Sequence, residues 1–429
     1  MTYEIEACMT APLLRSTPHP RRWLICGLLF AATTINYLDR QVLSLLAPDL
    51  QRNLGWTEED YGNIVTAFQA AYALALVGVG QVIDRIGVRL GYALSVGLWS
   101  LASIGHAAVS SVVGFGCMRA VLGVFEAGNF PAAIKTVAEW FPRQERALAN
   151  GLFNTGSIAG AILAPLSVPW LAHQFGWQAT FIIMGGLGFA WIVAWWMCYG
   201  KLQTTNSICP SDEEPSDDGE TIPVSSLLTR RSTWALIVAR LCSDPIWWFF
   251  LFWLAKFLDS RYGLKLTDMS LPLVTIYGIA AIGSIGGGWL PRRWMAQGVD
   301  MRTARLRSLL ICALAVVPVF LAVREVGLWT AVVLIGVAMA AHCAWISNVF
   351  ALVSDLFPRR SVGTVAGISG MAGSVGGMIM SYGAGKILAH TGSYVILFSI
   401  AAISYLCGWF FIRLLIPKSP AQKRTTSWI

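Results

Sequence analysis

The feature that most limits the fold of this chain is the recurrence of apolar segments about 20 residues long, the length at which a helix crosses the roughly 30 Å core of a bilayer. Twelve such segments begin near residues 23, 61, 90, 112, 147, 178, 234, 269, 308, 328, 361 and 393. Hydrophobic residues make up 56% of the chain and charged residues only 13%, which is unlike a soluble globular protein. The sequence therefore predicts an all-α integral membrane protein with twelve transmembrane helices.

A polar segment in the middle of the chain divides these helices into two sets of six. Residues 201–233 contain the acidic stretch SDEEPSDDGE and have no apolar face, which is typical of a flexible linker. We therefore expect an N-terminal segment (1–22), a first six-helix half (23–200), the linker, a second half (234–416) and a C-terminal tail (417–429).

The distribution of basic residues predicts the orientation. Most of the 31 Lys and Arg residues lie in segments on the side of the N-terminus, and positive loops remain in the cytoplasm. Both termini are therefore expected to be cytoplasmic. The same bias accounts for the net charge of +8, so the expected partner is the lipid bilayer and not a nucleic acid. The nine cysteines form no CxxC pair or metal-ligand spacing, and no metal site is expected.

The two halves contain related sequences. FPRQERALANGLFNTGSIAGA (141–161) aligns with FPRRSVGTVAGISGMAGSVGG (357–377) at an offset of 216 residues, and the same offset relates Gly176 to Gly392. A shared offset across two helices and two loops indicates an internal repeat. Parallel six-helix repeats place a substrate site near the middle of the bilayer, between the halves.

Four charges lie inside the predicted spans of the first half. Asp39 and Arg40 interrupt the first span, and Asp39 lies ~24 Å along that helix from Trp23. Arg119 and Glu126 are seven residues apart on one helix, about 20° short of two turns, so they share a face. Charges inside a bilayer are costly unless they are paired or line a wet cavity. We predict that these four side chains line one cavity.

Two interpretations of these charges are open. Ion pairs of Arg119 with Asp39 and of Arg40 with Glu126 would only hold the helices together, although desolvation consumes most of the Coulomb gain of buried pairs. Alternatively, the arginines hold a substrate carboxylate in bidentate geometry while the acids take up protons. Substrate binding to the arginines would then release the acids to protonate, which couples anion and proton movement.

Aromatic and hydrogen-bonding side chains near these charges suit a sugar substrate, because aromatic rings stack on the apolar face of a pyranose and amide or imidazole groups recognise hydroxyls. The substrate-binding candidates are Tyr37, Tyr72, Asn154, Ser157, Trp247, Trp248, His342, Asn348 and Ser374. For the tryptophans, packing against lipid is the alternative, and for His342 it is an interhelical hydrogen bond. Pro245 is expected to interrupt its helix near this site.

The loop GQVIDRIGVRLG (80–91) matches the G-x-x-x-D-R-x-G-x-R/K pattern of the major facilitator superfamily, and the resemblance covers essentially the whole chain. The residues that carry it are Gly80, Asp84, Arg85, Gly87 and Arg89. The resemblance implies that this motif locks a gate, whereas the simpler alternative is a positively charged anchor in the cytoplasm. In the equivalent loop of the second half, Pro291 stands where the acid would be.

INYLDRQVLS, the Arg119-to-Glu126 spacing and AAIKTVAEWFP resemble the anion:cation symporter family of this superfamily, and CSDPIWWFFLFWLAKFL and GSIGGGWLPRR resemble its bacterial hexuronate transporters. The resemblance implies proton-coupled symport of a hexuronate by alternating access, in a monomer in the bacterial inner membrane, with protons as coupling ions and no cofactor. It also implies Asp39 and Glu126 as proton-carrying acids and Arg40 and Arg119 as anion or coupling residues.

Some alternatives stay open. The family tends to have a proline where this chain has Ala255, so the substrate could be another carboxylate such as galactonate, glucarate or a phthalate-like acid. A membrane enzyme or a non-transporting sensor is less favoured, since the chain has no nucleophile elbow, phosphate-binding loop or added output domain. The sequence also leaves open whether Arg40 contacts the substrate or tunes Asp39, and the proton stoichiometry.

Overall fold

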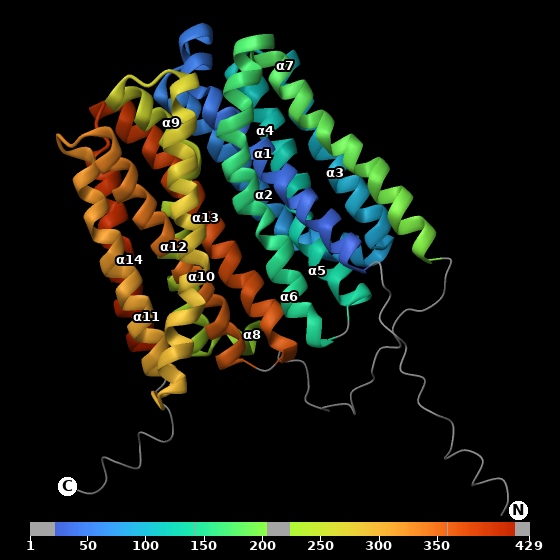
Figure 1. Cartoon of the computed structure of the whole chain (residues 1–429), viewed down its shortest axis with the longest axis vertical. Coiled ribbons are helices and arrows are strands. Elements are labelled where there is room, and N and C mark those ends of the chain that lie inside the picture. Colours follow the sequence, from blue (N-terminus) through green and yellow to red (C-terminus); the bar gives the residue numbers. More distant parts are fainter. Residues whose placement is uncertain (1–21, 142, 204–223, 358, 417–429) are drawn as a thin grey trace, which may run out of the picture.

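The computed structural model describes residues 22–141, 143–203, 224–357 and 359–416, and within these ranges every regular element is helical. The all-α prediction is confirmed. Figure 1 shows long helices side by side in two groups, with the first half (blue to green) on the right and the second half (yellow to red) on the left. The predicted terminal segments and most of the predicted linker lie outside the described residues.

The first half ends with a helix that doubles back. Its elements are α1 (Arg22–Leu54), α2 (Glu58–Ile86), α3 (Val88–Gly105), η1 (His106–Ala108), α4 (Val112–Glu126), α5 (Asn129–Trp140), α6 (Arg143–Asn154) and α7 (Gly156–Gln203). Within α7, Gly176 has φ 83° and ψ 167°, a conformation that glycine adopts far more readily than other residues. The chain reverses there, so α7 contains two helical arms (Figure 1).

The second half shows two departures from the sequence-based expectations. Its elements are α8 (Val224–Leu228), α9 (Arg231–Tyr262), η2 (Leu266–Met269), α10 (Ser270–Ala296), α11 (Met301–Val316), η3 (Val317–Val323), α12 (Leu328–Leu356), α13 (Arg359–Thr391) and α14 (Val395–Leu415). The segment 201–233, expected to lack structure, contains α8 and the start of α9. The expected interruption at Pro245 is wrong, because α9 continues through it and its ring packs against Gly376 of α13.

Among the described residues, eight helical segments are long and apolar enough to cross a membrane. One of them, Leu148–Tyr199, contains both arms of α7. Three predicted spans fall outside this set. α1 carries Asp39 and Arg40 near its middle, and α3 and α4 are only 18 and 15 residues long. These exceptions are the helices in which polar residues interrupt the apolar sequence or the helix itself is short.

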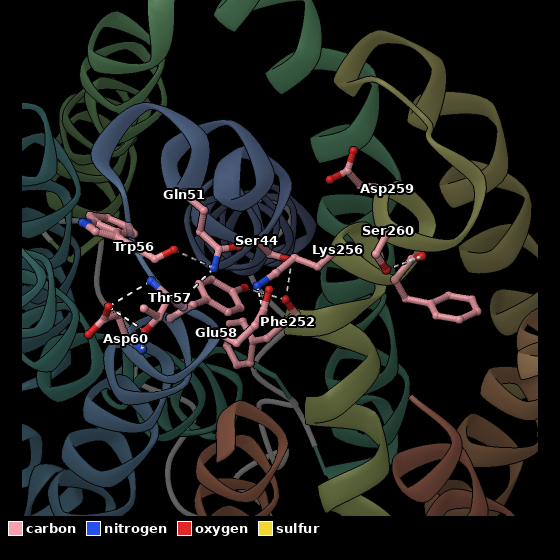
Figure 2. A network of polar contacts seen from close by, with 12 residues as sticks. Ser44, Gln51, Trp56, Thr57, Glu58, Asp60, Phe252, Lys256, Asp259 and Ser260 are labelled. Atoms are coloured by element: carbon pink, nitrogen blue, oxygen red, sulfur yellow. Dashed lines mark hydrogen bonds and ion pairs between the residues drawn. The ribbon is translucent and has the colours of Figure 1, made fainter. Parts of the chain in front are cut away.

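The two halves meet toward one end of the bundle. We call the end at which α1 begins and α14 ends the proximal end, and the opposite end the distal end. Near the distal end, the hydroxyl of Ser44 donates to the carbonyl of Phe252 (3.2 Å), as Figure 2 shows, and to that of Leu251 (2.9 Å). The hydroxyl of Tyr61 donates to the carbonyl of Phe252 (2.5 Å). Two helices of the first half are thus bonded to the backbone of α9.

Ion pairs reinforce this distal contact. Lys256 on α9 pairs with Glu58 at the start of α2 (Figure 2), and Lys386 on α13 pairs with the adjacent Glu59. Arg52 at the end of α1 pairs with Asp259 on α9, with 3.1 Å between Nη1 and Oδ2. Because each pair joins the first half to the second, these residues hold the distal end closed.

The helices α2 and α13 touch without intervening side chains. A Cβ atom added to Gly62 of α2 would lie 2.9 Å from Cα of Gly385 on α13, closer than real Cβ atoms approach other atoms. The absence of a side chain at both positions lets the two backbones come into direct contact, as small residues do at membrane helix interfaces.

Toward the proximal end, α9 becomes more exposed. Trp248 contacts the first half and is 8% exposed, whereas Leu241 is 41% exposed. These residues are seven positions apart and therefore point in nearly the same direction from the helix axis. The same face of α9 is therefore buried at Trp248 and exposed two turns nearer the proximal end.

Candidate functional site

Arg40 on α1 and Glu126, the last residue of α4, form an ion pair inside the first half. Nε of Arg40 lies 2.5 Å from Oε2 of Glu126, and the two residues are 1% and 0% exposed. Nη2 of Arg40 and Oε1 of Glu126 have no hydrogen-bond partner in the part of the chain that the structure describes. The pair is therefore close, yet each group keeps hydrogen-bonding capacity for another molecule.

Aromatic rings surround the guanidinium of Arg40. Its Cζ atom lies 4.8 to 5.5 Å from four ring centroids, which belong to Tyr37, Phe68, Tyr72 and Trp248. Cation–π contacts at such distances contribute ~0.5–2 kcal/mol each. Trp248 comes from the second half, so Arg40 lies where the two halves meet. We refer to Arg40, Glu126 and these four rings as the Arg40 cluster.

Arg119 and Asp39 lie beside this cluster but are not paired with each other. Nη2 of Arg119 donates to the main-chain carbonyl of Arg40 (3.3 Å), and its Nε and Nη1 have no hydrogen-bond partner among the described residues. Oδ1 of Asp39 accepts from the hydroxyl of Ser103 on α3 (2.8 Å), while Oδ2 has no such partner. Of the two ion pairs considered from the sequence, only that of Arg40 with Glu126 is present.

Other buried polar atoms near these charges also lack hydrogen-bond partners within the described ranges. They belong to Asn36 and Gln41 on α1, Gln69 on α2 and His106 at the end of α3. Each such atom costs ~1–3 kcal/mol of stability. Several of them beside four buried charges are poorly explained by packing, and they indicate a site that binds a polar solute.

The predicted residues Asn154 and Ser157 are hydrogen-bonded to each other. The hydroxyl of Ser157 donates to the carbonyl of Asn154 (2.7 Å), and Asn154 is exposed. No hydrogen bond links either residue to the Arg40 cluster within the described chain. Both lie at the junction of α6 and α7, where Gly160 packs so closely on α1 that an added Cβ would lie 2.7 Å from Cβ of Tyr37.

Among the predicted residues of the second half, Trp248 lies in the Arg40 cluster, whereas the others make their contacts within their own half. Trp247 stacks on His342 with 5.0 Å between ring centroids, and Nδ1 of His342 lies 2.6 Å from the hydroxyl of Tyr405. Asn348 is fully buried, and its amide donates to Gly287, Ser308 and Ala344. It therefore holds α10, α11 and α12 together in this conformation. Ser374 is buried beside Gly373 on α13.

The motif at the proximal end of α2 lies within the first half. Nζ of Lys135 on α5 pairs with Asp84 (2.6 Å), and Arg89 lies over the ring of Trp196, 4.3 Å from its centroid. Gly87 has φ 83° and ends α2, which explains the glycine. Gly80 and Arg85 both lie on α2 before this turn, and Arg85 is exposed. In this conformation Asp84 is thus bonded to its own half.

Three important residues were missed by the sequence-based prediction. Phe68 and Ser103 contact the arginines and Asp39, but no motif distinguishes them from other apolar-segment residues. Lys256 lies within an apolar segment and is only 5% exposed. The cost of burying an ammonium group inside an apolar segment is the signal that would have identified it.

The known proteins that this chain resembles are membrane transporters. The model of the Major Facilitator Superfamily matches residues 29–381. The chain is 30% identical to the hexuronate transporter of Escherichia coli (strain K12), over 93% of this chain and 95% of that protein. It is 32% identical to the galacturonate transporter of Dickeya chrysanthemi, over 63% and 81%. A bacterial homologue of the human lysosomal transporter Spinster, crystallised in an inward-facing, unoccupied conformation, has the same fold, with a TM-score of 0.71, 17% identity and coverage of 94% and 100%.

Proposed function

Since this chain belongs to the Major Facilitator Superfamily and is a transporter, not an enzyme, we propose that it carries a hexuronate together with a proton by alternating access. We place it as a monomer in a bacterial cytoplasmic membrane with both termini in the cytoplasm. The distal end then faces the outside, and the conformation described here is open to the cytoplasm. The relatives named for hexuronate and galacturonate transport support this choice of substrate.

The observation that carries the proposal is the position of the Arg40–Glu126 pair against Trp248. A substrate carboxylate can replace the Glu126 carboxylate on Arg40 one for one, in the planar geometry that a guanidinium favours. The rings of Tyr72 and Trp248 offer apolar faces for the sugar ring. Because Trp248 belongs to the second half, a sugar bound here contacts both halves, as alternating access requires.

Proton coupling follows from the same exchange. When the substrate takes Arg40, the carboxylate of Glu126 is left buried without its partner, and a proton neutralises it. One negative charge and one proton then enter together, so the charge of the site stays constant. Asp39, which is hydrogen-bonded to Ser103 and faces no ion-pair partner among the described residues, is the second acid that we assign to proton transfer.

Counterflow in proteoliposomes tests the substrate. Purified protein is loaded with unlabelled glucuronate, and competition is measured with galacturonate, galactonate, glucarate and phthalate. We expect glucuronate and galacturonate to exchange best. Preference for galactonate, glucarate or phthalate would retain anion transport and reject the hexuronate, and exchange of none of the five would reject the proposed function.

Glu126→Gln tests proton coupling. We expect this variant to retain exchange but to lose accumulation driven by an imposed pH gradient, since the neutral side chain imitates the protonated acid. The matched control is Glu145→Gln, which removes a glutamate bonded to Arg22 away from the Arg40 cluster. Equal loss of exchange and accumulation in Glu126→Gln would instead indicate a structural or binding role.

A further inference from the structure

A second ion pair, partly buried, lies on α9 in the other half of the molecule. Nε of Arg240 is 2.8 Å from Oδ2 of Asp244, and these side chains are 16% and 9% exposed. Oδ1 of Asp244 accepts from the hydroxyl of Ser243 (3.1 Å). Nε is the buried nitrogen of Arg240, and within the described residues no hydrogen bond is seen for its Nη1 or Nη2, while the side chain as a whole is 16% exposed. Arg240 therefore keeps Nη donors that its contact with Asp244 through Nε leaves available.

Arg240, Asp244 and Trp248 follow one another at four-residue spacing along α9. Consecutive members of such a series lie one helical turn, ~6 Å, apart. Trp248 belongs to the Arg40 cluster, so the stripe extends from that cluster for about 12 Å toward the proximal end. The exposure of α9 rises in the same direction, from 8% at Trp248 to 41% at Leu241.

α13 leaves room for each member of this stripe. A Cβ atom on Gly377 would collide with the ring of Trp248, and one on Gly373 would collide with the carboxylate of Asp244. At Gly370, a Cβ atom would lie 3.9 Å from Nη2 of Arg240. The glycines thus make room for the ring of Trp248 and the carboxylate of Asp244, and they leave the guanidinium of Arg240 less confined than that carboxylate.

The surroundings of Arg240 repeat those of Arg40. In each case a carboxylate on Nε neutralises the guanidinium, and an aromatic ring lies against it. For Arg240 this ring is Phe350, 5.3 Å from Cζ and 48% exposed. The partial exposure of both Phe350 and Arg240 makes this pair more accessible than the Arg40–Glu126 pair.

We propose that the Arg240–Asp244 pair is a second binding position for the substrate carboxylate, occupied between the Arg40 cluster and the proximal opening. A carboxylate that leaves Arg40 meets the free Nη donors of Arg240 two turns along α9. Asp244 neutralises Arg240 when no substrate is there, which keeps the position from retaining anions too tightly. This inference rests on the proposed transport of a sugar acid and adds a residue from the second half.

The rival explanation is an ion pair that only stabilises the packing of α9 against α13. The two explanations differ in what happens when both charges are removed. Loss of one partner leaves an uncompensated buried charge, whereas loss of both is often nearly neutral for stability. If the pair only stabilises packing, the double change should restore the wild-type KM. If Arg240 binds the anion, the KM should stay raised in the double variant.

The test measures the KM for radiolabelled glucuronate from each face, with inside-out vesicles for the proximal face and right-side-out vesicles for the distal face. We expect Arg240→Gln to raise the proximal KM about tenfold, the effect of losing one charge-assisted hydrogen bond, and to leave the distal KM within about twofold. Arg240→Lys, which keeps the charge but loses the planar fork, should fall between. Arg240→Gln/Asp244→Asn should keep the raised proximal KM.

Arg413→Gln is the matched control, because this exposed arginine lies on α14 against Trp409 and away from the cleft. Equal KM changes at both faces, or a return to wild-type KM in the double variant, would overturn the inference but leave the proposed function intact. Failure of the wild type to carry glucuronate would overturn both. If Arg240→Gln does not fold, the double variant, with the pair's net charge unchanged, provides the measurement.

Discussion

Phe68 is the side chain that links the two buried arginines. Its ring centroid lies 5.5 Å from Cζ of Arg40 and 5.8 Å from Cζ of Arg119, and the residue is 0% exposed. The ring also contacts Trp248 of the second half, at 6.4 Å between centroids. A single aromatic residue thus adjoins both cations and the contact between the halves.

We predict that Phe68→Leu weakens substrate binding while preserving most of the apolar volume. The change removes a ring face beside both guanidinium groups, and a loss of ~1–2 kcal/mol corresponds to a roughly tenfold higher KM. Counterflow measures it. Phe320→Leu, which removes a ring of η3 that lies beside Arg324, should leave KM unchanged. An unaltered KM in Phe68→Leu would show that the ring contributes packing only.

The cost of burying charge inside a bilayer was the basis for selecting the central candidate residues from the sequence. It identified Asp39, Arg40, Arg119 and Glu126, and the structure brings all four into the interior of the first half. It did not identify their neighbours. Ser103 contacts Asp39 across 64 positions of sequence, and such a pairing depends on how α1 and α3 pack, which a single sequence does not encode in any local pattern.

At the scale of helices, we expect the contact of α2 with α13 to control how readily the distal end opens. Gly62→Ala would place a methyl group 2.9 Å from Cα of Gly385 and 3.3 Å from the carbonyl of Ser381. Neither backbone atom can move aside independently, so the helices must separate. We therefore predict that this variant favours the state in which the distal end is open.

Chemical labelling measures that shift. A cysteine in place of Ser381, which is 0% exposed at this contact, should react faster with a membrane-impermeant maleimide in Gly62→Ala than in the parent. Gly78→Ala is the control on the same helix, because an added Cβ there meets nothing within 4 Å. Equal labelling rates in all three proteins would contradict the prediction.

The apolar pattern predicted where helices occur better than where they bend. Glycine reverses α7 at Gly176, a position that the repeat comparison already singled out. Pro245, by contrast, lies within an unbroken α9. Proline removes one hydrogen bond wherever it stands, but packing against Gly376 supplies compensating contact that the local sequence does not reveal.

Across the two halves, the distal ion pairs differ in burial and therefore in strength. The side chain of Lys256 is 5% exposed, and its Nζ lies 4.7 Å from the ring centroid of Tyr61 and 5.1 Å from that of Trp253. The side chain of Lys386 is 39% exposed. Exposed pairs contribute at most ~1 kcal/mol and are screened by salt, whereas buried pairs are screened much less.

We predict that Lys256→Gln opens the distal end much more than Lys386→Gln does. The first change leaves Glu58 without its partner and removes the cation from two rings, whereas the second removes only an exposed charge. The same labelling assay at 0.1 and 1 M salt, where the Debye length falls from ~10 to ~3 Å, should show little salt dependence in the wild type. Strong salt dependence would assign the closure to the exposed pairs.

The direct contact of Gly62 with Gly385 also restricts how this transporter can evolve. A larger residue in a protein core is often tolerated once a neighbour becomes smaller, but glycine has no side chain left to shorten. No exchange at position 385 can therefore rescue a larger residue at position 62, and the reverse holds as well. Genetic suppressors of either change are expected elsewhere, at positions that let α2 and α13 lie farther apart, and these two glycines should persist together or be lost together.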